Sequence, residues 1–234
     1  MTIQAAAMDD TALLDLWEAG SNCQGLDRAL LLLRGTGAAR PDEDLSALPI
    51  GERDVRLLRE RMRRFGTHCE ATVDCPVCGE RLAFPLDLDA LSASLVPAAR
   101  DVVVACSSGS YRLPNSQDIA AALGQPRPRL ALALRCRLHG DTPIDEAALD
   151  ELDTAMAATD PAALVDIALA CQACGVAFTA SFDIAGTFWS DVSRQARQVL
   201  DEVHLLASAY GWSEHEVLAV PQARRRHYLR RLAG

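Results

Sequence analysis

Two short cysteine segments of this chain are near copies of each other. The first reads CPVCG at 75–79 and the second reads CQACG at 171–175. In such a turn two thiolates converge on one ion, and the glycine permits the tight reversal after the second sulfur. Two turns together supply a closed tetrahedral cage with no position left open for chemistry. We therefore predict one structural Zn²⁺ bound by Cys75, Cys78, Cys171 and Cys174.

The two cysteine segments are far apart in the sequence. Between Cys78 and Cys171 lie 92 residues, which is longer than the loop of a compact zinc ribbon. Strand-like segments enter and leave both turns, at 69–73, 81–86, 165–170 and 176–184. This pattern predicts a zinc ribbon split by an inserted subdomain. Two unrelated reduced dithiols, or a redox pair, are the alternatives, but a thioredoxin-type motif has a single Cys-x-x-Cys at a strand-to-helix turn.

The remaining periodicity predicts an α+β fold that is mostly helical. The expected regions are an N-terminal helical segment (1–66), the first ribbon half (67–87), an inserted α/β subdomain (88–162), the second ribbon half (163–184) and a C-terminal helical segment (185–234). In the first region we expect a helix capped by Asp10, a second at 26–33 and a third after 49–51. In the insert we expect a hairpin around 107–109, then helices capped by Asn115 or Ser116 and spanning 130–138 and 144–158.

The third N-terminal helix carries an arginine-rich face. Its members are Arg53, Arg56, Arg59, Arg63 and Arg64. Such a face can bind phosphate or an acidic partner. Glu52, Asp54 and Glu60 in the same segment favour instead a solvated face whose charges pair internally.

Three further cysteines and one histidine are possible ligands. Cys136 and His139 have Cys-x-x-His spacing and could form a second site with Cys106, while Cys69 lies six residues before the first turn. Buried structural thiols are the simpler interpretation. Cys23 has no assigned role.

Composition limits the function. A net charge of −9 over 234 residues disfavours nucleic-acid binding, and 5% aromatic residues make base-stacking surfaces improbable. All 23 Lys+Arg residues are arginine. No charged-then-apolar leader is evident, and no apolar run approaches the roughly 18 residues of a membrane span. We expect a cytoplasmic protein with reduced thiols and no membrane partner. No nucleophile–base pair or phosphate loop is evident, so no catalytic residue is assigned and an enzyme is not expected.

The C-terminal region has a seam of apolar residues at alternating spacings of four and three. They are Ala185, Trp189, Val192, Ala196, Val199, Val203, Leu206 and Tyr210, which predicts a long helix over about 187–210. Gly211 should end this helix, a capping box at 213–216 should begin the next, and Pro221 should begin the last.

Several segments, in this order, resemble the baseplate hub assembly chaperones of contractile-tailed phages and phage-like contractile injection systems. They are ALPIGERD at 47–54, LL at 57–58, FG at 65–66, CPVCGE at 75–80, YRLPNSQD at 111–118, EVHLLA at 202–207, YGWSE at 210–214 and RRRHYL at 224–229. The resemblance implies a non-enzymatic helper in building the baseplate hub, with a hub or spike protein as its partner. It supplies no catalytic residue.

The C-terminal unit, residues 211–232, is the expected partner surface. Trp212 would be an aromatic anchor, and Arg224, Arg225 and Arg226 would make charge-assisted contacts with an acidic client. Alternatively, Trp212 packs on its own helices and the arginines are solvated. Two other function classes remain. One is a zinc-ribbon protein associated with nucleic acid or transcription, for which the arginines at 53–64 and 224–231 would be local footprints. The other is a metal-dependent enzyme, which needs a ligand set with a vacancy, such as three cysteines plus water, and a base in a pocket; the four turn cysteines leave no such vacancy.

Overall fold

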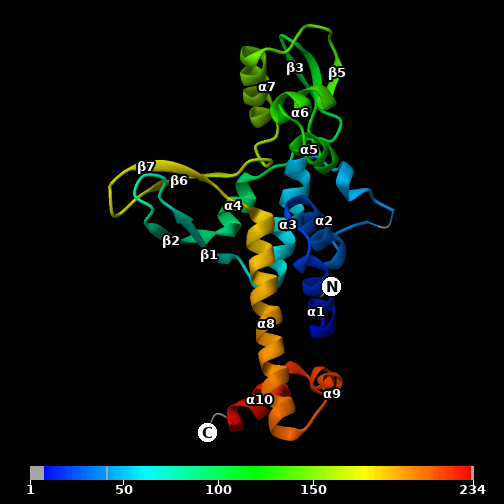
Figure 1. Ribbon diagram of the computed structural model, residues 1–234, viewed down its shortest axis with the longest axis vertical. Helices are drawn as coiled ribbons and strands as arrows, with labels where there is room; N and C mark the ends of the chain where they lie inside the picture. Colours follow the sequence, from blue (N-terminus) through cyan, green and yellow to red (C-terminus); the bar gives the residue numbers. More distant parts are fainter. Residues whose placement is uncertain (1–7, 41, 233–234) are drawn as a thin grey trace.

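The computed structural model describes residues 8–40 and 42–232. The molecule is elongated, and one long helix, α8 (Ile184–Tyr210), runs along much of its length (Figure 1). Two β-hairpins project from its side, a group of small strands and helices lies at one end, and two short helices lie at the other. The fold is α+β and mostly helical, as predicted. Within the described residues, none of the helices is long and apolar enough to cross a bilayer.

Three N-terminal helices pack along α8. They are α1 (Asp10–Ser21), α2 (Gly25–Gly35) and α3 (Ile50–Phe65), with a 3-10 turn, η1 (Leu45–Ala47), before α3. Asp9, and not the predicted Asp10, caps α1 by accepting a hydrogen bond from the Ala12 N–H at 2.8 Å. The Asp10 carboxylate instead accepts a hydrogen bond from Arg225. Leucines from all three helices surround Phe188 of α8 in the main core.

Helix α8 is long because both of its ends are capped. The Asp183 side chain accepts a hydrogen bond from the Gly186 N–H, and Gly211 ends the helix in the left-handed conformation at φ 69°. The predicted seam is buried over its middle, at Val192, Ala196, Val199, Val203 and Leu206. Tyr210, at the end of the seam, is 40% exposed. Phe188 is fully buried although it lies outside the predicted seam, because the wide N-terminal bundle covers more than one stripe of the helix.

The strands beside the cysteines form two antiparallel hairpins. The first is β1 (His68–Asp74) with β2 (Arg81–Asp87), and the second is β6 (Asp166–Ala170) with β7 (Ala177–Ser181). Alternate residues along all four strands are exposed and half-buried, as the period-two pattern predicts. In Figure 1 the two hairpins extend together from the helical body, with both turns at the far end.

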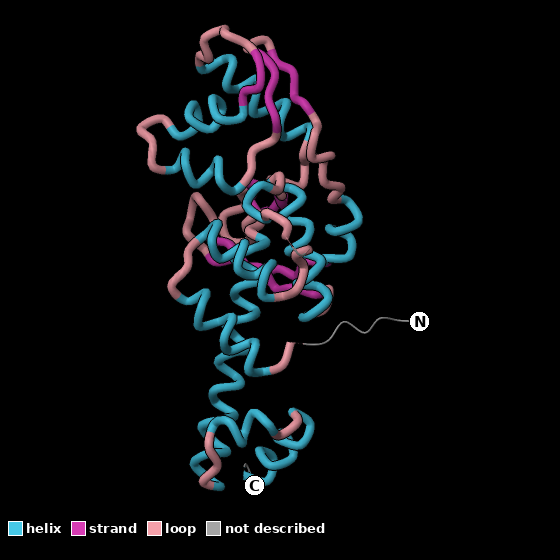
Figure 2. Tube along the Cα trace, turned by 90° about the vertical axis from the view of Figure 1, so that its right-hand side faces the viewer, coloured by secondary structure: helices cyan, strands magenta, loops and turns pink. Residues whose placement is uncertain are grey.

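After the first hairpin, α4 (Leu88–Ser94) packs on the main core. Most of the chain that follows folds around its own small core. Its elements are β3 (Val103–Cys106), β4 (Gly109–Arg112), α5 (Ser116–Leu123), α6 (Pro128–Cys136), β5 (Arg137–His139) and α7 (Glu146–Thr159). Tyr111, Cys136, Leu149 and Leu152 are buried together there. The predicted hairpin is confirmed, and of the two predicted caps it is Asn115 that caps α5, in a capping box with Asp118. Figure 2 shows the three strands beside the helices at this end of the molecule.

One boundary in this region was predicted wrongly. The sequence suggested a helix over 130–138, but α6 ends at Cys136, and 137–139 forms a strand. The strand pairs with β4 at Ser110 and Tyr111. Arg137 also lies over the Tyr111 ring, with its guanidinium carbon 5.7 Å from the ring centroid. These tertiary contacts outweigh the local preference for helix.

The C-terminal unit contains α9 (Glu214–Ala219) and α10 (Gln222–Leu232). The predicted capping box at 213–216 is confirmed by reciprocal hydrogen bonds between Ser213 and Glu216. Tyr210, Trp212 and Tyr228 pack as an aromatic trio, with ring centroids 5.0–5.7 Å apart. The trio fixes α10 across the end of α8.

Candidate metal centre

The four predicted cysteine ligands lie together at the tips of the two hairpins. Their sulfur atoms all fall within 4.8 Å of one another. Cys75 Sγ lies 3.8 Å from Cys174 Sγ, and Cys78 Sγ lies 3.6 Å from Cys171 Sγ. A tetrahedron with metal–sulfur bonds of about 2.3 Å has edges of about 3.8 Å. The cluster therefore has the size of a four-thiolate metal site.

The backbone of the two turns is nearly identical. In the first turn the Cys75 N–H donates to the Glu80 carbonyl at 2.8 Å, and the Gly79 N–H donates to the Cys75 carbonyl at 2.9 Å. In the second, the equivalent bonds run from Cys171 to Val176 and from Gly175 to Cys171, both at 2.9 Å.

The glycine in each turn has a left-handed backbone. Gly79 has φ 73° and Gly175 has φ 74°, which is the conformation the sequence pattern requires of them. Each turn thus presents its two sulfurs toward the other turn.

The electrostatics of the cluster favour a cation. The backbone N–H of Cys78 stabilises the Cys75 thiolate and lowers the pKa of Cys75 to about 7. For Cys78 itself, the N–H of Glu80 acts in the same direction, but partial desolvation within the cluster and the neighbouring sulfurs outweigh it and raise its pKa to about 12. Several thiolates cannot ionise side by side without a compensating positive charge. A bound metal ion would supply that charge and displace the remaining protons.

Cys75 and Cys171 are buried, whereas Cys78 and Cys174 face solvent. A metal ion at the centre would bind four sulfurs, which leaves no position for water or substrate. The arrangement can therefore join two hairpins, and it lacks the vacancy that metal-ion catalysis needs.

The other cysteines do not gather into a second site among the described residues. Cys136 is completely buried, and burial raises its pKa to about 11. Burial also raises the pKa of Cys69 and of Cys106. The Cys23 thiol donates a hydrogen bond to the Ala19 carbonyl within α1. His139 is exposed on β5, so the Cys-x-x-His spacing brings no buried ligand pair together.

A cleft of about 720 Å³ lies at the base of the hairpins, between β1, β7 and the start of α8. Its wall contains a buried ion pair between Arg61 Nε and Asp191 at 2.8 Å, which sequence reasoning missed. Arg61 also donates to the carbonyls of Gly66 and His68. These contacts tie α3, β1 and α8 together beneath the metal centre. In the sequence, the one signal for these contacts of Arg61 is its spacing of four residues from Leu57, which places it on the buried face of α3.

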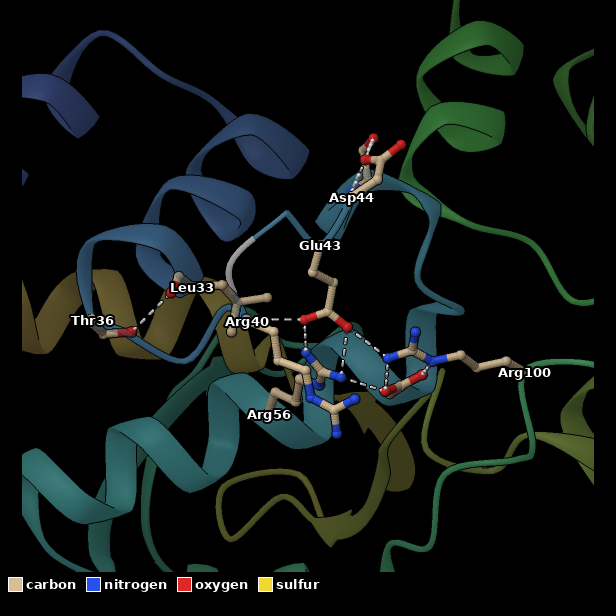
Figure 3. A network of polar contacts seen from close by, with 9 residues as sticks. Leu33, Thr36, Arg40, Glu43, Asp44, Arg56 and Arg100 are labelled. Carbon is tan, nitrogen blue, oxygen red and sulfur yellow. Dashed lines mark hydrogen bonds and ion pairs between the residues drawn. The ribbon is translucent and has the colours of Figure 1, made fainter. Parts of the chain in front are cut away.

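Most arginines of the arginine-rich face of α3 form ion pairs with carboxylates of the same helix, as the interpretation of internally paired charges predicts. Glu43 accepts hydrogen bonds from Arg56 and Arg100, and these arginines lower the pKa of its carboxyl to about 2 (Figure 3). Arg56 and Arg100 also bind Glu52. Arg53, which was assigned to the exposed face, is buried between Asp54 and Ser116.

The predicted partner residues fall into two groups. Arg224 and Arg226 are exposed on α10. Arg225 is only 1% exposed and binds Asp10 and Glu202, so in this fold it does not belong to the outer surface. Trp212 is half-buried against Tyr210 and Tyr228, which matches the alternative that it packs on its own helices.

Comparison with known proteins adds no relative. No protein-family model, curated protein or solved structure matches this chain. The chemistry of the cysteine cluster and the geometry of the fold therefore carry the functional argument.

Proposed function

We propose that the cysteine cluster binds one structural Zn²⁺ and that the two hairpins are the halves of a split zinc ribbon. The observation that carries this proposal is the clustering of four sulfurs within 4.8 Å of one another, with two distances of 3.6 and 3.8 Å between turns that have matching backbone hydrogen bonds. Four-thiolate tetrahedral sites suit Zn²⁺ or iron. Zn²⁺ is preferred here because a closed four-cysteine site built from two Cys-x-x-Cys turns is a common arrangement for structural zinc.

Metal analysis and absorption spectra of the purified protein test this proposal. We expect one zinc per chain and no visible absorption, whereas iron in a four-thiolate site is coloured. Replacement of Cys75, Cys78, Cys171 and Cys174 by serine should abolish stoichiometric zinc. Cys136→Ser is the matched control, because Cys136 lies in another core, and it should retain the ion. Zinc in the quadruple variant would refute the assignment.

We further propose that the protein is a non-enzymatic assembly factor for the baseplate hub of a phage-like contractile injection system, acting in the cytoplasm on a hub or spike protein. The support is the resemblance of its segments to that chaperone family, together with a metal centre that has no vacancy. The resembling segments also meet in pairs. Pro49 pairs with Asn115, and the Ile50 N–H donates to the Pro114 carbonyl at 3.2 Å.

The C-terminal resembling segments meet in the same way. Glu202 binds Arg225, and Trp212 packs on Tyr228. Contacts between segments distant in sequence explain why these residue types would occur together in such a family.

Deletion of the gene in a host that produces the particles tests the assembly role. We expect loss of sheathed particles, restored by the intact chain, and co-purification of a hub or spike component from the whole gene cluster. Normal particle yield after deletion would refute the role.

A second candidate is a zinc-ribbon protein that binds nucleic acid. One observation favours it, namely the exposed arginines of α10. The net charge of −9 opposes it. Filter binding with a salt titration separates the two candidates, because a phosphate-binding surface loses affinity steeply as salt rises.

A further inference from the structure

The exposed face of α10 carries positive charge that the described part of the chain does not neutralise. Arg225 is paired twice, but Arg224, Arg226, Arg230 and Arg231 form no ion pair with any described residue. Several arginines elsewhere are held by carboxylates, as Arg129 is by Glu146, Asp150 and Asp153, although Arg59 and Arg197 also form no ion pair with a described residue. In an acidic protein, four neighbouring arginines without carboxylates form a local basic surface.

An apolar groove lies directly beside this charge. It has a volume of about 460 Å³ and is bounded by Leu205 of α8 and by Leu229, Arg230 and Leu232 of α10. Leu205 is 51% exposed and Leu232 is 43% exposed. A single exposed leucine is ordinary, but two that border one groove form a site at which a partner can bury apolar surface. We call this site the α8–α10 groove.

Two of these arginines border the α8–α10 groove: Arg230 lines it, and Arg226 lies one turn before Arg230 on α10. Arg226 and Arg230 are four residues apart on α10 and so lie on the same helix face, adjacent to Leu229. The groove therefore has an apolar floor and a basic rim. An amphipathic helix with a leucine stripe and flanking carboxylates has the complementary pattern.

The position of the groove leaves space for such a helix. The C-terminal unit lies at the end of α8, away from the hairpins and from the inserted strands (Figure 1; Figure 2). Its own aromatic trio and the Arg225 pairs hold α10 against α8. The groove is thus a feature of a fixed helix pair.

We propose that the α8–α10 groove binds an acidic amphipathic helix of a partner protein. Leucines of the partner enter the groove between Leu205 and Leu229, and its carboxylates bind Arg226 and Arg230. Naming that partner as a hub or spike component rests on the proposed function, but the groove and its ligand chemistry do not.

The test uses the full-length zinc-loaded protein and a fluorescent synthetic helix. This probe has leucine at positions i, i+3, i+4 and i+7 and glutamate on both flanks, and a scrambled peptide of equal composition is its control. We expect the probe to bind more tightly than the scrambled peptide in fluorescence anisotropy. Arg230→Glu and Leu205→Ser should each weaken its affinity about tenfold or more. Arg59→Glu, the same charge change at an exposed site on α3, should leave the affinity unchanged.

Four results would overturn the proposal. The scrambled peptide binds as tightly as the probe, or the Arg230→Glu variant keeps the affinity of the parent. Sedimentation shows that the chain dimerises through the groove and so blocks the probe. A DNA duplex competes with the probe for the groove, which would assign the surface to nucleic acid instead. The particle-yield experiment is separate. Normal yield after gene deletion refutes the assembly role and leaves the peptide result standing, whereas failed peptide binding refutes only the groove.

Discussion

Replacing Arg225 by methionine separates a buried structural arginine from a partner-binding one. Arg225 is 1% exposed, and its guanidinium donates to Glu202 at 3.1 Å, to Asp10 and to the Val220 carbonyl at 2.8 Å. Burial opposes the charge of Arg225, but the two carboxylates outweigh it and raise its pKa. Methionine fills similar volume and leaves Glu202 buried without its cation.

The magnitude follows from these contacts. Removing one member of a buried ion pair costs about 3–5 kcal/mol. The Asp10 side chain is 18% exposed and can be hydrated, which favours the lower end of that range. Loss of the hydrogen bond to Val220, at the end of α9, adds about 1 kcal/mol. We expect Arg225→Met to lower the free energy of unfolding of the C-terminal unit by about 3–4 kcal/mol.

Urea unfolding followed by tryptophan fluorescence measures this change, because Trp212 lies in the same unit. Arg224→Met and Arg226→Met are matched controls on exposed neighbours and should change stability by less than about 0.5 kcal/mol. The double variant Glu202→Gln/Arg225→Met removes both charges and should recover part of the loss. If Arg225→Met unfolds at the same urea concentration as the two controls, the buried pair does not stabilise the unit and our reasoning fails.

The remaining predictions concern the other regions. Val199→Asp buries an unpaired charge in the seam and should destabilise the protein by about 2 kcal/mol or more. Gln198→Asp, on the exposed face of α8, is the control and should have little effect. Equal thermal stability of the two variants would contradict burial of the seam. Glu43→Gln should destabilise the protein at pH 7. Because the folded-state pKa of Glu43 is lowered to about 2, its contribution is present above the unfolded pKa near 4.5 and is lost as pH falls toward 2, so the variant and parent should converge there in pH-dependent unfolding. Asp160→Ala leaves the Gly51 N–H, a donor at 3.0 Å, without its acceptor and should cost about 1–3 kcal/mol in chemical unfolding; an unchanged midpoint would show that water replaces the carboxylate.

The elements that the sequence predicted best are those defined by short-range signals. The glycines of the two cysteine turns, the alternation along the hairpins, the cap of α5 and the capping box at Ser213 each depend on residues within a few positions. Local chemistry of this kind is visible in one sequence. The four cysteines could be assigned to one site because their two segments repeat each other.

The features that were missed depend on distant partners. Arg61 is buried because Asp191, 130 positions away, neutralises it. Arg225 is buried because Asp10, 215 positions away, does the same. The position of Arg61 on the buried face of its helix indicates burial but does not identify Asp191 as its partner, and nothing local distinguishes Arg225 from Arg224 or Arg226. Burial of a charge is a property of the assembled fold.

The way the insert joins the body limits what the metal ion has to hold. The chain leaves β2 through Leu88, which is fully buried in the main core, and returns through Ala162 and Val165, which are buried in the same core. Both ends of the insert are therefore anchored on the helical body, and its interior has a separate core around Tyr111. A metal ion bound at the hairpin tips would not need to close a free loop of 92 residues. It would hold one half-buried hairpin against the other, above the Arg61–Asp191 pair. In the proposed split ribbon, an insert of this size would not weaken the site, because each half enters it from an anchored strand.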